Sequence, residues 1–160
     1  MKLISRQHNR FIFEVSEPEK VLLLAILKLF PLSPLSHPRR QLSRNAAAPD
    51  AAANQQLLED SLKIQQTDGR KWVASFCAEP GRFTPDGSGF RFATTRPEVE
   101  QLLQVLNDVR IGSWIALGSP ESEQREEQLL NAQTAVHVHR LELAGLFQMF
   151  FLKAVSGAED

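Results

Sequence analysis

The sequence contains one pattern twice, and this pattern constrains the fold more than any other feature. Residues 11–27 read FIFEVSEPEKVLLLAIL, and residues 90–106 read FRFATTRPEVEQLLQVL, with 7 of the 17 aligned positions identical. Each copy opens with Phe at alternate positions, which is typical of a strand with one buried face. Ser16 in one copy and Thr95 in the other are followed three residues later by Glu, with Pro between them, which is the signature of a capped helix start. The sequence therefore predicts, twice, a strand that leads directly into a capped helix.

We expect the two strands to pair and to bring the two halves of the chain together. A polar QHNR turn lies inside residues 2–15, and PDGSG lies inside residues 82–94, which favours two hairpins. Because Ser/Thr-x-Pro-Glu is a general helix start, we interpret the repeat as a structural device and not as a functional motif.

Helical patterns occupy most of the remaining chain. Residues 50–78 carry a stripe with spacings of three and four, although TDG at 67–69 leaves open whether they form one helix or two, and we favour one bent helix. A last helix is expected to end near Ser156 and Gly157. The predicted fold is a single, mainly α domain over residues 1–160, a bundle of four or five helices with a small antiparallel sheet built from residues 2–15 and 82–94.

Composition excludes several classes of protein. Hydrophobic residues make up 42% and charged residues 23% of the chain, as in ordinary globular proteins. The single cysteine, Cys77, excludes an internal disulfide. No apolar leader and no stretch suited to a membrane span is evident, which predicts a cytoplasmic protein with no membrane association. No Walker loop, GxSxG, HExxH or CxxC motif occurs, so we predict no catalytic residue, no cofactor and no metal site.

A loop rich in proline and arginine is expected at residues 31–49, which hold four of the nine prolines. Residues 1–50 carry 8 Lys/Arg against 4 Asp/Glu. Arg39, Arg40 and Arg44 in the loop are candidate nucleic-acid contacts, and a solvated linker is the simpler interpretation. The overall pI of about 6.4 is well below the value of about 9 that is typical of nucleic-acid-binding domains.

The helix that is expected to begin at Arg96 carries a charged residue, Arg110, on the face predicted to point into the core. With 100° between successive residues, a core face centred on Leu106 includes Arg110 and leaves Asp108 on the other side. A buried guanidinium needs a carboxylate partner, so Arg110→Ala is expected to cost about 3–5 kcal/mol. The expected buried polar network consists of Asn107, Arg110, Glu142 and Glu59.

Two helices are apolar on more than one side. The last helix has two nearly opposite apolar stripes, and the helix from Arg96 has apolar residues outside its core face. Such helices lie either at the centre of a fold or in a homodimer interface, and the sequence leaves both open. The candidate interface residues are Ile111, Ile115, Val138, Leu141, Gly145, Met149 and Leu152.

The VHVHR segment places His137 and His139 two residues apart. On a strand both would face one side and suit a metal ion, whereas on a helix they lie about 200° apart and cannot share one. The segment has a helical pattern, so a metal-dependent enzyme at this pair is the least favoured hypothesis.

The runs LLQVLNDVRIGSWIALG and HRLELAGLFQMFFLKAV resemble the C-terminal half of a bacterial domain-of-unknown-function family, which in actinobacteria is often encoded beside the Clp-protease adaptor. The shared motif is Leu106, Asn107, Asp108 and Arg110, with Val109 variable, and the match covers residues 95–155. The resemblance implies a mainly helical bacterial protein with no established enzyme activity and a regulatory role, including redox regulation. Redox sensing by a cysteine pair does not transfer, because the chain has one cysteine.

These observations favour a non-enzymatic, cytoplasmic regulatory or adaptor protein that acts through a protein partner or as a homodimer. A nucleic-acid-binding regulator that uses the basic N-terminal half is the first alternative. A metal-dependent enzyme at His137 and His139 is the second.

Overall fold

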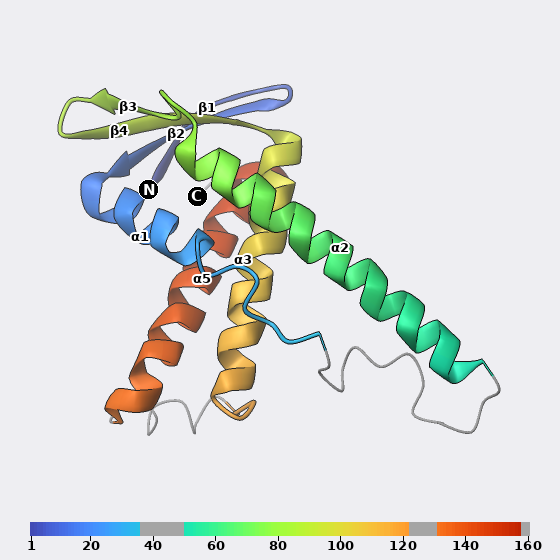
Figure 1. Cartoon of the computed structure of the whole chain (residues 1–160). Helices are drawn as coiled ribbons and strands as arrows, with labels where there is room; N and C mark the ends of the chain where they lie inside the picture. Colours follow the sequence, from blue (N-terminus) through green and yellow to red (C-terminus); the bar gives the residue numbers. More distant parts are fainter. Residues whose placement is uncertain (36–49, 122–130, 158–160) are drawn as a thin grey trace.

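The computed structural model describes residues 1–35, 50–121 and 131–157. Its elements follow one another along the chain in the order strand, strand, helix, helix, strand, strand, helix, helix (Figure 1). They are β1 (Lys2–Gln7), β2 (Arg10–Ser16), α1 (Glu17–Leu27), α2 (Ala51–Ala78), β3 (Phe83–Asp86), β4 (Gly89–Thr95), α3 (Arg96–Ala116) and α5 (Ala132–Ser156).

The four strands form one antiparallel sheet in the order β1-β2-β4-β3. The predicted pairing of the two Phe-bearing strands is confirmed, because β2 and β4 are the central neighbours. Phe13 lies directly opposite Phe92 in this ladder, with ring centroids 5.2 Å apart. These two residues also occupy the same position in the sequence repeat, so the ladder is centred on a pair of equivalent residues.

Both helix starts have the predicted capping box. The Ser16 side chain accepts a hydrogen bond from the backbone N–H of Glu19, and the Glu19 carboxylate accepts one from the backbone N–H of Ser16. Thr95 and Glu98 repeat this arrangement at the start of α3. Each box satisfies backbone donors that the first turn of a helix leaves open, so the two helices begin at defined residues.

Helices α1, α3 and α5 lie on the same side of the sheet (Figure 1). Alternate residues of β2 and β4 point toward them, and Phe11, Phe13 and Phe92 are almost completely buried. Among the described residues no helix covers the other side of the sheet. The helical side of the core is formed chiefly by Leu23, Leu27, Leu102, Leu106, Val109, Phe147 and Phe151.

The expected bundle of four or five helices is wrong. The described residues form four helices and a four-stranded antiparallel sheet, which is an α+β arrangement of a sheet layer and a helix layer. The sheet lies within one residue of the predicted location, at residues 2–16 and 83–95 where 2–15 and 82–94 were expected, but it is not a small addition. Its buried aromatic side chains form the sheet side of the core, and the helices pack against them instead of closing around one another.

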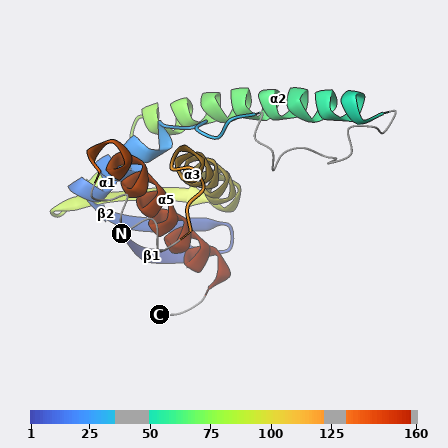
Figure 2. The ribbon, with the colours of Figure 1, turned by 90° about the horizontal axis from the view of Figure 1, so that it is seen from below.

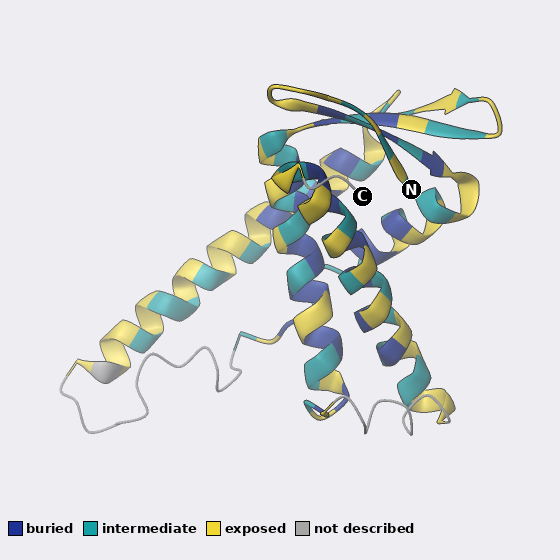
Figure 3. Ribbon diagram, turned by 180° about the vertical axis from the view of Figure 1, so that it is seen from behind, coloured by how far each residue is buried: buried dark blue, intermediate teal, exposed yellow. Residues whose placement is uncertain are grey.

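Helix α2 is one continuous helix of 28 residues, as the unbroken stripe favoured. Its second half packs on the body: Gly69 is buried against the Phe30 ring, and Val73 and Phe76 are buried. Its first half extends well beyond the edge of the sheet (Figures 1 and 2). We call residues 52–64 the α2 arm, and most of its surface is exposed (Figure 3).

Candidate functional site

An apolar groove lies between β1, α1 and α5, with a volume of about 750 Å³. Leu22 of α1 and both Leu146 and Met149 of α5 line it, although they are 41%, 55% and 51% exposed. Leu3, Leu143 and Phe150 are half-buried in its wall. Large apolar side chains that face a shared hollow and remain in contact with water make this groove a candidate binding surface.

The groove exists because α5 is apolar on more than one side. One side of the helix, which includes Ala144, Phe147 and Phe151, is buried in the main core. Leu146 and Met149 lie on another side of the helix and stay exposed. The second apolar stripe predicted for this helix is therefore buried at Val138 and Leu141 and exposed at Met149 and Leu152.

Positive charge gathers where the groove meets the end of α5. Arg6 and Lys153 line the groove, and Arg6 Nη2 donates a hydrogen bond to the carbonyl of Val155 at 3.3 Å. Gly157 ends α5 in the left-handed conformation, and a Cβ there would collide with the Arg6 guanidinium. Cations are favoured at this point, because the carbonyl end of a helix is electronegative.

The carboxylate in the groove wall is already engaged. Glu19 belongs to the α1 capping box and also pairs with the N-terminal ammonium group. Burial raises the pKa of Glu19, but the N-terminal ammonium and the hydrogen bonds from Ser16 outweigh this effect and hold the pKa below its ordinary value. Glu19 therefore stays ionised at neutral pH, while Arg6 and Lys153 provide the opposite charge at the other part of the wall.

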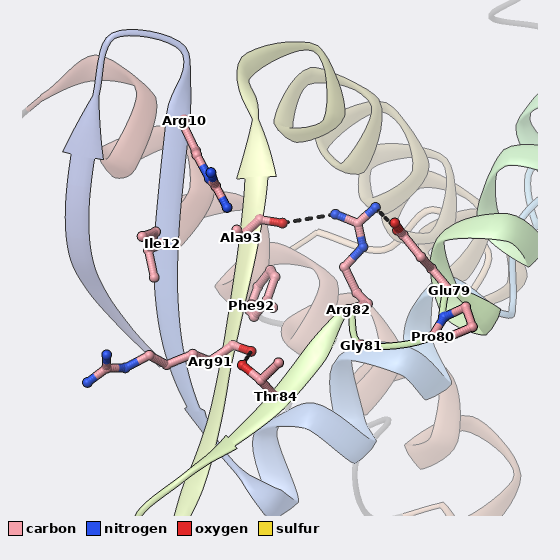
Figure 4. A pocket seen from close by; sticks show the side chains of 10 residues that line it. All are labelled: Arg10, Ile12, Glu79, Pro80, Gly81, Arg82, Thr84, Arg91, Phe92 and Ala93. Atoms are coloured by element: carbon pink, nitrogen blue, oxygen red, sulfur yellow. Dashed lines mark hydrogen bonds and ion pairs between the residues drawn. The ribbon is translucent and has the colours of Figure 1, made fainter.

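A second hollow, of about 430 Å³, contains three arginines on the open side of the sheet (Figure 4). Arg82 lies at its centre and donates to the carbonyl of Ala93 at 2.9 Å and to Glu98 at 2.8 Å. It also pairs with Glu79, and its guanidinium lies 4.5 Å from the centre of the Phe76 ring. Arg82 thus connects the end of α2 to β4 and to the start of α3.

The charges in this arginine pocket are largely used within the chain. Arg91 pairs with Asp86 at 2.6 Å. Burial raises the pKa of Glu98, but hydrogen bonds from Thr95 and Arg82 and the charge of Arg82 outweigh it and lower the pKa. Since Arg82 and Arg91 already have carboxylate partners, the pocket offers less free charge for a ligand than its composition indicates. The apolar groove is the stronger candidate because it is larger and presents exposed apolar side chains.

The predicted polar network around Arg110 does not form. Arg110 is exposed and donates a long hydrogen bond, 3.4 Å, to Asn107 Oδ1. Glu142 is exposed on α5, and Glu59 lies in the α2 arm, where it accepts from Gln55 at 3.2 Å. The four residues are not brought together, and the prediction that Arg110 is a buried charge is wrong.

Asp108 is the buried polar residue of this helix, with 9% of its surface exposed. Its Oδ1 accepts hydrogen bonds from the backbone N–H groups of Leu32 at 2.6 Å and of Ser33 at 3.1 Å. The core face of α3 is centred nearer Val109 than Leu106, about 60° further round. Asp108 and Arg110 therefore lie at opposite edges of this face, and only the Asp108 edge is covered by the segment after α1.

The seven predicted interface residues do not form one surface. Val138 and Leu141 are buried with Leu117 in a small second core cluster, against which Trp114 packs. Met149 is the member of the set that lines the apolar groove. The remaining members differ in exposure: Ile111 is 36% and Leu152 53% exposed, and Ile115 and Gly145 are half-buried.

The proposed metal pair lies on a helix. His137 is half-buried and His139 is exposed on α5, so their side chains diverge. Within residues 1–35, 50–121 and 131–157, no group of three His, Cys, Asp or Glu side chains has the arrangement of a metal site. Arg39, Arg40 and Arg44 of the nucleic-acid hypothesis lie outside the described residues.

Cys77 is half-buried near the end of α2. Burial raises the pKa of its thiol, and the charge of Lys28 opposes this effect without cancelling it. A thiol with a raised pKa is a poorer nucleophile than an ordinary cysteine at neutral pH.

Sequence reasoning missed the groove and Asp108. Leu22, Leu146 and Met149 are apolar residues in excess of those that one buried face per helix needs. The sequence does not show, however, that α1 and α5 place them around the same groove. For Asp108, the signal would have been the uncapped chain after α1, whose backbone donors need an acceptor.

Comparison of the chain with protein-family models, with curated proteins and with solved structures gives no match in any of the three. The family resemblance carried by Leu106, Asn107, Asp108 and Arg110 therefore remains a prediction. Among the described helices, none combines the length and the apolar character that a membrane crossing requires.

Proposed function

We propose that this chain is a cytoplasmic, non-enzymatic regulatory or adaptor protein that acts through protein–protein contacts, with the α2 arm as its contact surface and a second copy of the chain as its first partner. One observation carries the proposal. The arm stands away from the body while Leu57 and Ile64 on it are 68% and 64% exposed.

An arm of this kind gains little stability from the rest of the chain. Helices shorter than about 12–15 residues are marginal in water unless tertiary packing supports them. Leu57 and Ile64 are seven residues, or about two turns, apart and so share one face of the helix. Covering this face would remove both side chains from water and would support the arm along its length.

The charges of the arm favour a second copy as the covering partner. Glu59 and Asp60 are acidic and Lys63 is basic, with Lys63 Nζ 3.8 Å from Asp60 Oδ1. A surface that carries both signs can complement itself when two copies meet about a two-fold axis. The apolar pair would then lie between the two arms.

The test is the mass of the protein in solution, measured by light scattering over a range of concentrations. The chain has a mass of 18.0 kDa, and we expect a concentration-dependent dimer of twice that mass. Leu57→Glu combined with Ile64→Glu should give a monomer, because both changes place charge on the shared face. Ala52→Glu, on another side of the same arm, is the matched control and should remain dimeric. A wild-type protein that stays monomeric at high concentration contradicts the proposal.

A further inference from the structure

The two edges of the sheet differ in whether their backbone can pair with another strand. β3, at one edge, has four residues and contains Pro85, which lacks the N–H that a ladder needs. β1, at the other edge, has six residues and no proline (Figure 1). Within the described part of the chain, the β1 backbone forms no hydrogen bond outside its ladder with β2. The β1 edge is therefore open to a further strand.

The alternation of the ladder shows which residues of β1 direct their backbone outward. Gln7 and Arg10 flank a two-residue turn and form a hydrogen-bonded pair. Arg6, the neighbour of Gln7, therefore directs its N–H and C=O away from β2. The register shift between Leu3 and Ser5 adds one residue to β1, so Leu3 is the next residue whose backbone faces outward. On a regular added strand, the residues opposite Leu3 and Arg6 would lie two positions apart.

The same two residues line the apolar groove. Leu3 and Arg6 lie opposite Phe13 and Phe11, which are buried on the helix side of the sheet. Residues that lie opposite each other in a ladder share a face, and both Leu3 and Arg6 belong to the groove lining. A strand added at β1 would thus direct alternate side chains into the groove and the intervening ones to the open side of the sheet.

The groove has room for several side chains of such a strand. Its volume is about 750 Å³, and its lining extends along α5 from Leu143 to Gly157, which is about 20 Å of helix. Alternate side chains of a strand are about 7 Å apart, so the groove can accept two or three of them. They would cover Leu22, Leu146 and Met149, which are exposed.

The charges of β1 decide which strand can be added. β1 carries Lys2 and Arg6 and no acidic residue, and neither forms an ion pair with another described residue. Arg6 donates to a neutral carbonyl, that of Val155. The N-terminal ammonium group is paired with Glu19, and Lys153 is engaged in another interaction. A second copy of β1 would oppose cations to cations in every register, which is destabilising, whereas a strand with an acidic residue is complementary.

We propose that β1 binds an extended segment of another protein as a fifth strand, with an acidic side chain opposite Arg6 and an apolar side chain opposite Leu3, both on the groove side. Backbone hydrogen bonds along the edge supply affinity, and the groove supplies the sequence preference. The α2 arm takes no part in this contact, so the inference goes beyond the proposed dimer and identifies a surface for a different partner.

The first experiment uses a fluorescein-labelled octapeptide in which valine alternates with threonine and one central valine is replaced by aspartate. Fluorescence anisotropy is expected to show saturable binding at one peptide per chain. Two N-methylated forms are the controls, one methylated at the valine and aspartate positions and one at the threonine positions. Because the amides of a strand point alternately to its two sides, only one form should lose affinity, by at least about tenfold. Equal affinity of the two forms, or no saturable binding of the parent peptide, overturns the proposal.

Matched variants of the protein locate the site. Leu146→Glu places a charge inside the groove and should abolish peptide binding, whereas Leu152→Glu, on the same helix and 53% exposed but outside the lining, should not. Wild-type protein should prefer the aspartate peptide over its lysine counterpart by about threefold, and Arg6→Glu should reverse this preference. Equal loss in the two leucine variants, or an unchanged preference in Arg6→Glu, would contradict the assignment.

Hydrogen exchange of single amides, measured by NMR, tests the backbone pairing itself. The amides of Leu3 and Arg6 should exchange quickly in the free protein and at least about tenfold more slowly in the presence of the peptide. The amide of Gln7, which is bonded within the hairpin, should be slow in both states. A peptide that binds without protecting Leu3 and Arg6 does not pair with β1, and the proposal then fails.

The variants of the α2 arm separate this inference from the proposed dimer. Leu57→Glu combined with Ile64→Glu should bind the peptide with wild-type affinity, and loss of binding in this variant would place the peptide on the arm. A monomeric wild-type protein that binds the peptide at β1 removes the dimer and leaves the strand site in place. If Leu146→Glu converts a wild-type dimer into a monomer, a second copy occupies the groove and the strand proposal fails.

Discussion

At the scale of single residues, Asp108 is buried and Arg110 is exposed, whereas the sequence predicted the opposite. Both lie at the edge of the core face of α3, two positions apart. The segment after α1 covers one edge and brings Leu32 N–H and Ser33 N–H to the Asp108 carboxylate. The other edge stays open, so Arg110 needs no partner. Which edge is covered depends on a segment 75 residues away in sequence, and helical periodicity carries no information about it.

We expect Asp108→Ala to lower the free energy of unfolding by about 2–4 kcal/mol, because it leaves two backbone donors without their charged acceptor. Arg110→Ala is the control on the opposite edge of the face, and it should change the stability by less than about 0.5 kcal/mol because its side chain is exposed. Urea unfolding of the two variants measures both values. A larger loss for Arg110→Ala than for Asp108→Ala would restore the buried-arginine interpretation.

At the scale of elements, the close packing of α3 depends on a small residue. Gly112 is buried, and a Cβ at this position would lie 2.6 Å from the carbonyl carbon of Leu32 and 2.8 Å from its oxygen. Gly112 and Asp108 are one turn apart, so the same stretch of α3 both approaches the segment after α1 and binds its backbone. Gly145 of α5, one of the candidate interface residues, has open surroundings instead, because the nearest atom to a Cβ there is Arg110 Cδ at 3.8 Å.

Substitution of these two glycines should have opposite effects on stability. Gly112→Ala is expected to destabilise the protein by about 1–3 kcal/mol, because the clashing atoms belong to backbone that cannot move freely. Gly145→Ala should stabilise it by about 0.5–1 kcal/mol, since alanine is the better helix former and meets no clash. Thermal unfolding of the two proteins compares them directly. A stabilised Gly112→Ala variant would show that the segment after α1 does not lie against α3.

At the scale of the whole molecule, the protein is a compact two-layer body with one long helix that leaves it. The second half of α2 is joined to the body by Gly69, Val73 and Phe76, while the arm meets little of it. Stability therefore differs along one uninterrupted helix. Under the proposed function, this difference leaves the arm available to a second copy of the chain.

Hydrogen exchange should resolve the two halves of α2. We expect backbone amides of residues 54–64 to exchange at least about tenfold faster than those of residues 72–78, because local opening of the arm exposes little additional apolar surface. Mass spectrometry after proteolysis measures both segments. Protection of the arm should rise with protein concentration if a second copy covers it, and uniform protection in a dilute monomer would contradict a free-standing arm.

The sequence predicted those parts of the fold that depend on local patterns. Capping boxes, hairpin turns and the alternating Phe residues each act within a few positions, so Ser16, Thr95 and the pairing of β2 with β4 were predictable. The layer arrangement, the buried Asp108 and the apolar groove depend on which distant segments meet. The pattern of α5 alone does not show that Phe147 is buried while Leu146 and Met149 remain exposed. It also does not show that Leu146 and Met149 line the same groove as Leu22.

The central ladder has a geometric consequence of its own. Because Phe13 faces Phe92 and the two are equivalent in the repeat, an approximate two-fold axis passes between them and relates β2 to β4. Ser16 and Thr95, the two helix caps, accordingly lie at opposite ends of the ladder, opposite Gly89 and Arg10. An axis of this kind is the symmetry of an isologous dimer. The two strand–cap–helix units of this chain thus meet through one backbone ladder in the way that the two halves of such a dimer would.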